Sequence, residues 1–214
     1  MSRPAQPSRR ATFTLVPHKL PPGLTEPVGR ALARTGVTPN MITSLGLAGA
    51  VGASVLVARG EFLAGGLVML AAAALDLLDG IVARASGKVT AFGGVFDSVA
   101  DRLSEAAVLG GLLFRFASEG RREEIMLVFA AVVGSLLVSY VRARAEAAGA
   151  ELREGLFTRP ERVIVLGIGL IVDQPRIALW ILAVLANLTV LERVWVVRRR
   201  LREVEREAEP AGKR

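Results

Sequence analysis

Residues 62–82 read FLAGGLVMLAAAALDLLDGIV, an apolar run in which the only charged residues are Asp76 and Asp79. About 20 apolar residues in helical conformation cross the hydrocarbon core of a bilayer, which is roughly 30 Å thick. The run therefore predicts a membrane-spanning helix. Gly80 interrupts it near its end, directly after the second aspartate.

Similar apolar runs lie on both sides of this stretch. Five more spans are predicted, at about 41–58, 91–116, 125–141, 163–172 and 177–197. The fifth is short, so its first turns are expected to reach back toward Thr158. Because 52% of the 214 residues are hydrophobic, we predict an all-α polytopic membrane protein with six transmembrane helices.

The two ends of the chain are more polar than its middle. Residues 1–37 are expected to form a cytoplasmic N-terminal segment, in which Leu24–Thr35 has the pattern of an interfacial amphipathic helix. Residues 38–200 are expected to form the six-helix membrane domain, and 201–214 a charged cytoplasmic tail. The first long apolar run starts only near Met41, which argues against a cleavable signal peptide.

The net charge of +7 comes from lysines and arginines at the edges of the apolar runs. That placement favours anchoring by the positive-inside rule over nucleic-acid binding. Basic residues gather at both ends and after spans two and four, so these parts are predicted to be cytoplasmic, in a plasma-membrane protein. The chain has no cysteine and one histidine, His18, which excludes disulfides, thiol catalysis and cysteine-bound metals.

Four aspartates stand in or near two consecutive spans. Asp76 and Asp79 are three residues apart, and Asp97 and Asp101 are four apart, so each pair lies on one face of its helix. The connection between the helices, about Ala85–Thr90, is short. The helices should therefore be antiparallel, with both pairs at the cytoplasmic side.

Carboxylates at membrane depth carry a large desolvation cost and repel one another unless cations neutralise them. Oxygen ligands suit hard divalent ions, and the set could hold two Mg²⁺ or Mn²⁺ ions about 4 Å apart. The alternative is a set of helix-cap and salt-bridge acids, with Asp101 paired to Arg102 or Arg84.

The pattern Asp76-x-x-Asp79-Gly80-x-x-Ala83-Arg84, eight residues, then Gly93-x-x-x-Asp97-x-x-x-Asp101 resembles the signature of the CDP-alcohol phosphatidyltransferase family. Every fixed position is present, and the pattern of spans extends the likeness over about Thr38–Val197. The resemblance implies a CDP-diacylglycerol donor, an acceptor hydroxyl and CMP as the leaving group. It also implies a homodimer.

The resemblance implies roles for individual residues as well. Asp76, Asp79, Asp97 and Asp101 are expected to be metal ligands, and Asp101 is also expected to be the general base for the acceptor hydroxyl. The expected donor-binding residues are Asn40, Met41, Ile42, Thr43, Gly80, Ala83, Arg84 and Thr90.

The second half of the chain resembles the phosphatidylinositol-phosphate synthases of actinobacteria and their archaeal relatives. The likeness lies in SYVRARAE at residues 139–146 and RPER at residues 159–162. It implies inositol 1-phosphate as the acceptor, with its phosphate bound by Arg142, Arg144, Arg159 and Arg162. Arg142 stands where many of those enzymes have lysine, and positive-inside anchoring is the alternative role for all four arginines.

Other functions remain open on the sequence alone. A phosphatidylglycerophosphate synthase would use glycerol 3-phosphate with the same donor. A cation transporter would also need carboxylates inside the membrane, although the broken-helix repeats of transporters are not visible. A membrane scaffold would use the acids as pairing groups.

Overall fold

The structure is a computed structural model that describes residues 36–86, 89–150, 152 and 155–208. The side chains of residues 77, 79, 84–86 and 203–208 lie outside that description. The described chain is all-α, as predicted, with no strand in the described ranges. Its helices are α2 (Pro39–Ala58), α3 (Phe62–Ser86), α4 (Ala91–Ser118), α5 (Arg122–Ala147), α6 (Arg159–Ile171) and α7 (Pro175–Ala208). The expected interfacial helix at Leu24–Thr35 lies outside the described residues.

Threonines mark the beginnings of three of these helices. The Thr38 hydroxyl accepts a hydrogen bond from the Met41 amide at 3.3 Å, and the Thr90 hydroxyl accepts one from the Gly93 amide at 2.9 Å. Each satisfies a backbone donor that the first turn of a helix cannot pair internally. Thr158 precedes α6, but its hydroxyl donates a hydrogen bond to the Glu161 carboxylate instead of accepting one from the backbone.

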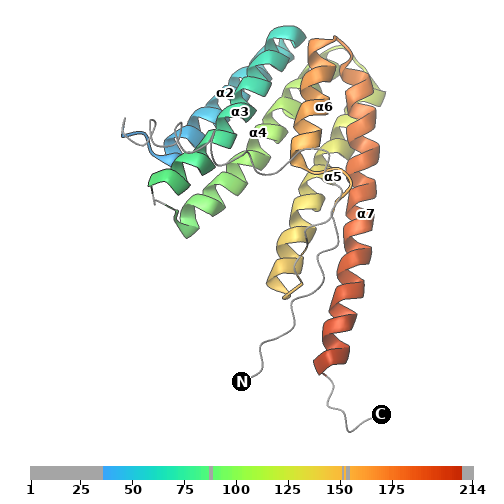
Figure 1. Cartoon of the computed structure of the whole chain (residues 1–214). Coiled ribbons are helices and arrows are strands. Elements are labelled where there is room, and N and C mark those ends of the chain that lie inside the picture. The colour runs from blue at the N-terminus through green and yellow to red at the C-terminus, as the bar shows by residue number, and fades with distance from the viewer. Residues whose placement is uncertain (1–35, 87–88, 151, 153–154, 209–214) are drawn as a thin grey trace.

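Three tight connections gather at one end of the molecule, at the top of Figure 1. They are residues 59–61, 119–121 and 172–174, and we call this the tight-turn end. Gly60 and Gly120 adopt φ values of 86° and 70° there, in the left-handed region that glycine enters without steric cost. The ends of α3, α5 and α7 point the opposite way, and α5 and α7 extend well beyond the other helices.

The helices pack in two groups of three. Helix α2 contacts α3 and α4, α7 contacts α5 and α6, and the groups meet where α3 contacts α6 and α4 contacts α5. Small residues allow the backbones to approach: a Cβ at Gly111 would lie 2.4 Å from the Ser54 carbonyl oxygen. The core between the groups is apolar and includes Val57, Leu109, Leu112, Phe116, Leu166, Leu170, Leu179 and Leu182.

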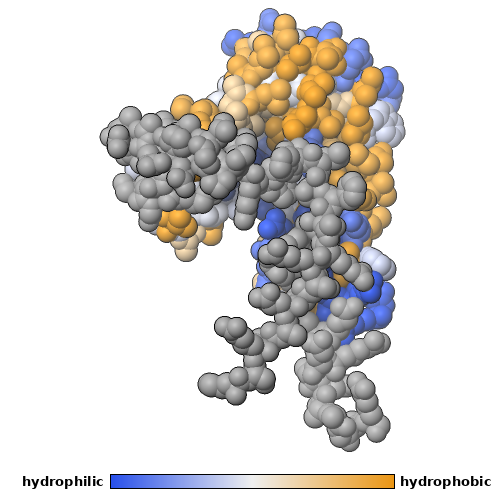
Figure 2. Space-filling view, in the orientation of Figure 1, coloured by the Kyte–Doolittle hydropathy of each residue, from blue (hydrophilic) through white to orange (hydrophobic). Residues whose placement is uncertain are grey.

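Four segments are long and apolar enough to cross a membrane: Pro39–Ala58, Phe62–Ala83, Arg122–Ala147 and Pro175–Arg202. Large apolar side chains such as Phe129, Leu67 and Trp195 are more than half exposed along these segments. Figure 2 shows apolar residues over the upper part of the molecule and hydrophilic ones where α5 and α7 project. Such an apolar surface is suited to contact with lipid rather than water, which indicates a membrane protein.

The other two helices do not meet the same criteria among the described residues. Helix α4 contains several charged side chains, and α6 has only 13 residues, shorter than a full span. The predicted starts and ends nevertheless fall close to the helices. The largest differences are at α5 and α7, which continue beyond the predicted spans to Ala147 and Ala208. A span ends where the apolar run ends, whereas a helix of charged residues can continue into water.

Candidate active site

Two of the four predicted aspartates meet on one cation. The Arg159 Nη2 atom lies 2.8 Å from an oxygen of Asp76 and 2.8 Å from an oxygen of Asp101. These three residues come from α3, α4 and α6. Their side chains are largely shielded, with 10% of Asp76, 21% of Asp101 and 27% of Arg159 exposed. The antiparallel helix pair therefore brings the acids together as the short connection predicts.

Gly46 on α2 makes room for the Asp76 carboxylate. A Cβ at this position would lie 2.4 Å from Asp76 Oδ1, closer than any real contact. Helix α2 thus forms one wall of a small cavity that Asp76 and Arg159 also line, together with Gly46, Ala50, Met69, Ala72, Ala73, Ser104, Glu105 and Val163.

The carboxylates fit a divalent metal in chemistry and in placement. The guanidinium nitrogen of Arg159 stands at a position where a cation contacts Asp76 and Asp101 together. Oxygen donors of this kind are the ligands that Mg²⁺ and Mn²⁺ prefer. Asp97 lies one turn before Asp101 on α4 and is half-buried, while the Asp79 side chain lies outside the described residues. Among the side chains that are described, no three acidic or histidine groups form a complete metal cluster.

The predicted donor-binding residues lie at the ends of three helices. Asn40, Met41, Ile42 and Thr43 form the first turn of α2, Gly80 and Ala83 lie in the last turns of α3, and Thr90 caps α4. A Cβ at Gly93 would lie 3.5 Å from Asn40 Oδ1, so the first turns of α2 and α4 are adjacent. Ile42 and Thr43 are buried and Met41 is exposed. The Arg84 side chain lies outside the described residues.

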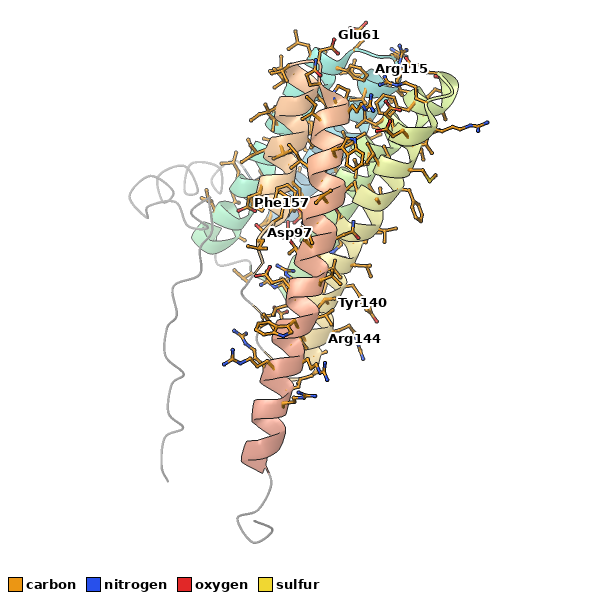
Figure 3. The ribbon with its side chains drawn as sticks, turned by 90° about the vertical axis from the view of Figure 1, so that its right-hand side faces the viewer. Glu61, Asp97, Arg115, Tyr140, Arg144 and Phe157 are labelled. Atoms are coloured by element: carbon orange, nitrogen blue, oxygen red, sulfur yellow. The ribbon has the colours of Figure 1, made fainter. Side chains whose placement is uncertain are left out.

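The four predicted phosphate-binding arginines occupy different surroundings. Arg159 lies on the aspartates, whereas Arg162 is buried and donates from Nε and Nη2 to the two oxygens of Glu105, at 2.7 and 2.9 Å. Arg142 pairs with Glu146 at 2.9 Å on the exposed face of α5. Arg144 is exposed on the same helix, near Tyr140 (Figure 3).

Asp101 contacts Arg159, a partner that the sequence analysis did not assign to it. Of the two alternatives, Arg102 donates from Nη1 to the Ser98 carbonyl within its own helix, and the side chain of Arg84 lies outside the described residues. A neighbour in sequence on a helix points to a different face, whereas a residue on a packed helix can reach the carboxylate directly.

Two buried charged residues near the site were not singled out from the sequence. Glu105 accepts hydrogen bonds from Arg162 and from the Ser135 hydroxyl, the latter at 2.8 Å. Arg193 on α7 is 4% exposed, and its Nη1 atom donates to the Val138 carbonyl at 2.6 Å. Both stand inside predicted apolar spans, and an ionisable residue in such a run is a signal that could have identified them.

Comparisons with known proteins identify the same family as the sequence pattern does. The profile of the CDP-alcohol phosphatidyltransferase family matches residues 36–197. The chain is 37% identical to the archaetidylinositol phosphate synthase of Pyrococcus horikoshii, over 82% of this chain and 92% of that one. It is 38% identical to the phosphatidylinositol phosphate synthase of Mycobacterium marinum, over 81% and 79% of the two chains.

Solved structures give the same result in three dimensions. The phosphatidylinositol phosphate synthase of Mycobacterium tuberculosis with bound CDP-DAG superposes with a TM-score of 0.76 at 35% identity, covering 82% of this chain and 94% of that one. The same enzyme in complex with manganese and citrate also gives 0.76 at 35% identity, covering 81% and 88%.

Proposed function

The chain belongs to the CDP-alcohol phosphatidyltransferase family, and from this premise we propose that it transfers a phosphatidyl group from CDP-diacylglycerol to a hydroxyl of inositol 1-phosphate, releasing CMP. The observation that carries the proposal is the meeting of Asp76 and Asp101 on one cation. Both belong to the family pattern, and two relatives at 37% and 38% identity are an archaetidylinositol phosphate synthase and a phosphatidylinositol phosphate synthase. That same membership favours an enzyme over a cation transporter.

Four aspartates would hold the metal: Asp76, Asp79, Asp97 and Asp101. When bound, divalent ions would supply positive charge beside the diphosphate of the donor, as Mg²⁺ or Mn²⁺ does in phosphoryl transfer. The manganese complex of the Mycobacterium tuberculosis relative supports a divalent ion. We propose two ions, from the number of carboxylates.

Asp101 is the proposed general base. The acceptor oxygen forms a bond to the phosphorus of the phosphatidyl group, the bond between that phosphorus and the CMP oxygen breaks, and the acceptor proton passes to Asp101. The donor-binding residues at the ends of α2, α3 and α4 would hold the cytidine diphosphate while the acyl chains remain in the bilayer. The same arrangement lets a polar acceptor enter from water.

Arginines are the proposed ligands of the acceptor phosphate. Arg159 supports this role by its position beside Asp101, and the predicted set also includes Arg142 and Arg144. The buried pair with Glu105 supports a positioning role for Arg162 instead, because both of its forked donors are already used. Arg193 is a further candidate, since it lies within electrostatic range of Arg142.

We propose that all six helices lie in the plasma membrane, with α4 and α6 shielded from lipid in part by their neighbours. The active site would face the cytoplasm, and the tight-turn end would face outward. The positive-inside rule supports this orientation, because Arg142 and Arg144 lie near the end of α5 and the arginines at 198–200 and 202 near the end of α7, and both helices project away from the tight turns there (Figure 1). A homodimer is proposed from the family resemblance.

The decisive experiment measures CMP release by the purified protein with CDP-diacylglycerol and Mg²⁺. We expect release with inositol 1-phosphate, little with glycerol 3-phosphate or with unphosphorylated inositol, and none in excess chelator. Restoring Mg²⁺ after chelation should restore the rate. Preferential use of glycerol 3-phosphate would reassign the acceptor, and undiminished release in chelator would contradict the metal assignment.

A further inference from the structure

Arg159 is held at the aspartates in an incomplete hydrogen-bonding arrangement. A single nitrogen, Nη2, contacts both Asp76 and Asp101. The Nε atom of the same guanidinium is buried and has no hydrogen-bond partner within the described part of the chain.

Arg162, one turn later on α6, provides a direct comparison. Its guanidinium uses two nitrogens on the two oxygens of Glu105, which is the forked geometry that makes arginine–carboxylate pairs strong and rigid. The Ser135 hydroxyl donates a further hydrogen bond to the Glu105 carboxylate. Helix α6 is thus anchored to α4 through two nitrogens of Arg162, while Arg159 contacts the aspartates through one nitrogen.

Charge explains why Arg159 nevertheless lies there. Asp76 and Asp101 approach each other in a largely shielded cavity, where two negative charges without a cation would repel strongly. Arg159 supplies one positive charge at the position where both carboxylates can reach it. A divalent ion at this position would supply two charges and would compete with the guanidinium for the same oxygens.

We propose that Arg159 acts as a counter-cation to Asp76 and Asp101 and is displaced from them when a divalent ion binds. The anchor at Arg162 keeps α6 in place, so the guanidinium leaves by a change of side-chain rotamer. Arg159 then becomes available to an anionic phosphate in the cavity. The displacement of Arg159 by a metal ion does not depend on the proposed function. The binding of the acceptor phosphate by Arg159 does rest on the proposed function. The acceptor site would thus be complete only after the metal has bound.

The test is a titration of the purified protein with Mn²⁺ alone, in detergent and without donor or acceptor. Arg159→Gln removes the competing cation, so its Mn²⁺ dissociation constant should fall about tenfold or more, the scale of a charge-assisted hydrogen bond. Arg144→Gln is the matched control, because it removes the same charge from an exposed position on α5. An unchanged or higher dissociation constant in Arg159→Gln, with the control like wild type, would overturn the proposal.

A second measurement uses the wild-type protein and so does not depend on how a variant folds. An arginine-selective dicarbonyl reagent is applied with and without Mn²⁺, and modification at each arginine is quantified by mass spectrometry. We expect modification of Arg159 to rise several-fold with Mn²⁺ while that of buried Arg162 stays low. Equal modification of Arg159 in both conditions would sink the displacement. Neither measurement uses CMP release, so failure of the proposed function would leave these results standing.

Discussion

Gly46 is the residue at which the packing of α2 bears most directly on the chemistry. The nearest atom to a Cβ at this position is Asp76 Oδ1, the end of a side chain that can rotate away, and the next is 3.4 Å distant. An alanine at position 46 should therefore leave the fold intact but displace the Asp76 carboxylate from its present position. The geometry of the acid, more than the stability of the helix pair, depends on this glycine.

The first prediction concerns Gly46→Ala. We expect the rate of CMP release to fall roughly tenfold to a hundredfold, because a ligand misplaced by about 1 Å loses much of the benefit of preorganisation. Thermal stability in detergent should change little. Gly52→Ala is the control, since it lies on the same helix and a Cβ there would meet nothing within 4 Å. Equal rates in both variants would show that Asp76 does not need its present position.

The second prediction concerns Asp101→Asn. Loss of a general base reduces turnover typically by about a hundredfold or more, and the variant also loses the charge that attracts a metal. We expect CMP release to drop at least by that amount while the protein remains folded, as checked by its elution as a single species in detergent. The amide can still accept one hydrogen bond from Arg159. Wild-type turnover would remove Asp101 from the reaction.

Helices α4, α5 and α6 are joined by one buried polar cluster: Glu105 from α4, Ser135 from α5 and Arg162 from α6. Arg162 is 2% exposed and Glu105 is 6% exposed, so neither charge has access to water. Removing one member of such a pair leaves the other charge buried and alone, at a cost of about 3–5 kcal/mol. The cluster therefore holds the three helices in one relative position.

The third prediction concerns the buried pair of Arg162 and Glu105. Arg162→Met should lower the thermal denaturation temperature in detergent by several degrees and reduce activity through the displacement of Arg159. Arg142→Met breaks the exposed pair with Glu146 and should change the temperature little, because exposed pairs contribute about 0–1 kcal/mol. Combining Arg162→Met with Glu105→Leu should recover much of the lost stability. A similar loss in the exposed control would argue against this account.

The two ends of the described molecule differ both in charge and in helix packing. Its tight turns lie at one end, and the aspartates, the arginine-rich part of α5 and the projecting half of α7 lie toward the other. Acceptor and leaving group are both water-soluble, so the enzyme needs an open approach from the side that holds them. A lipid donor in the bilayer and a soluble acceptor in water can meet only at the membrane surface, near the ends of the helices.

The fourth prediction tests this orientation. The chain has no cysteine, so single cysteines can be introduced without background labelling. A membrane-impermeant maleimide should label Arg122→Cys, near the tight turns, in intact cells, and should label Ala148→Cys only after permeabilisation. Both positions are exposed. Labelling of position 148 in intact cells would reverse the proposed topology.

The sequence by itself determined the helices and identified candidate residues for the site. Apolar runs of about 20 residues, threonine caps and the spacing of the aspartates are local properties, and each follows from the period of a helix. They predicted an all-α membrane protein, the antiparallel pair α3 and α4, and the acids that face each other. The family pattern added the donor and the acceptor class.

Only the tertiary structure decided which cation lies on those acids. Arg159 is 83 positions from Asp76, and no periodicity within a helix relates the two. Their contact depends on how α6 packs against α3, and the pairing of Arg162 with Glu105 on α4 depends on packing for the same reason. Local sequence specifies which face of a helix a side chain occupies, whereas the neighbour it meets is set by the packing of the whole bundle.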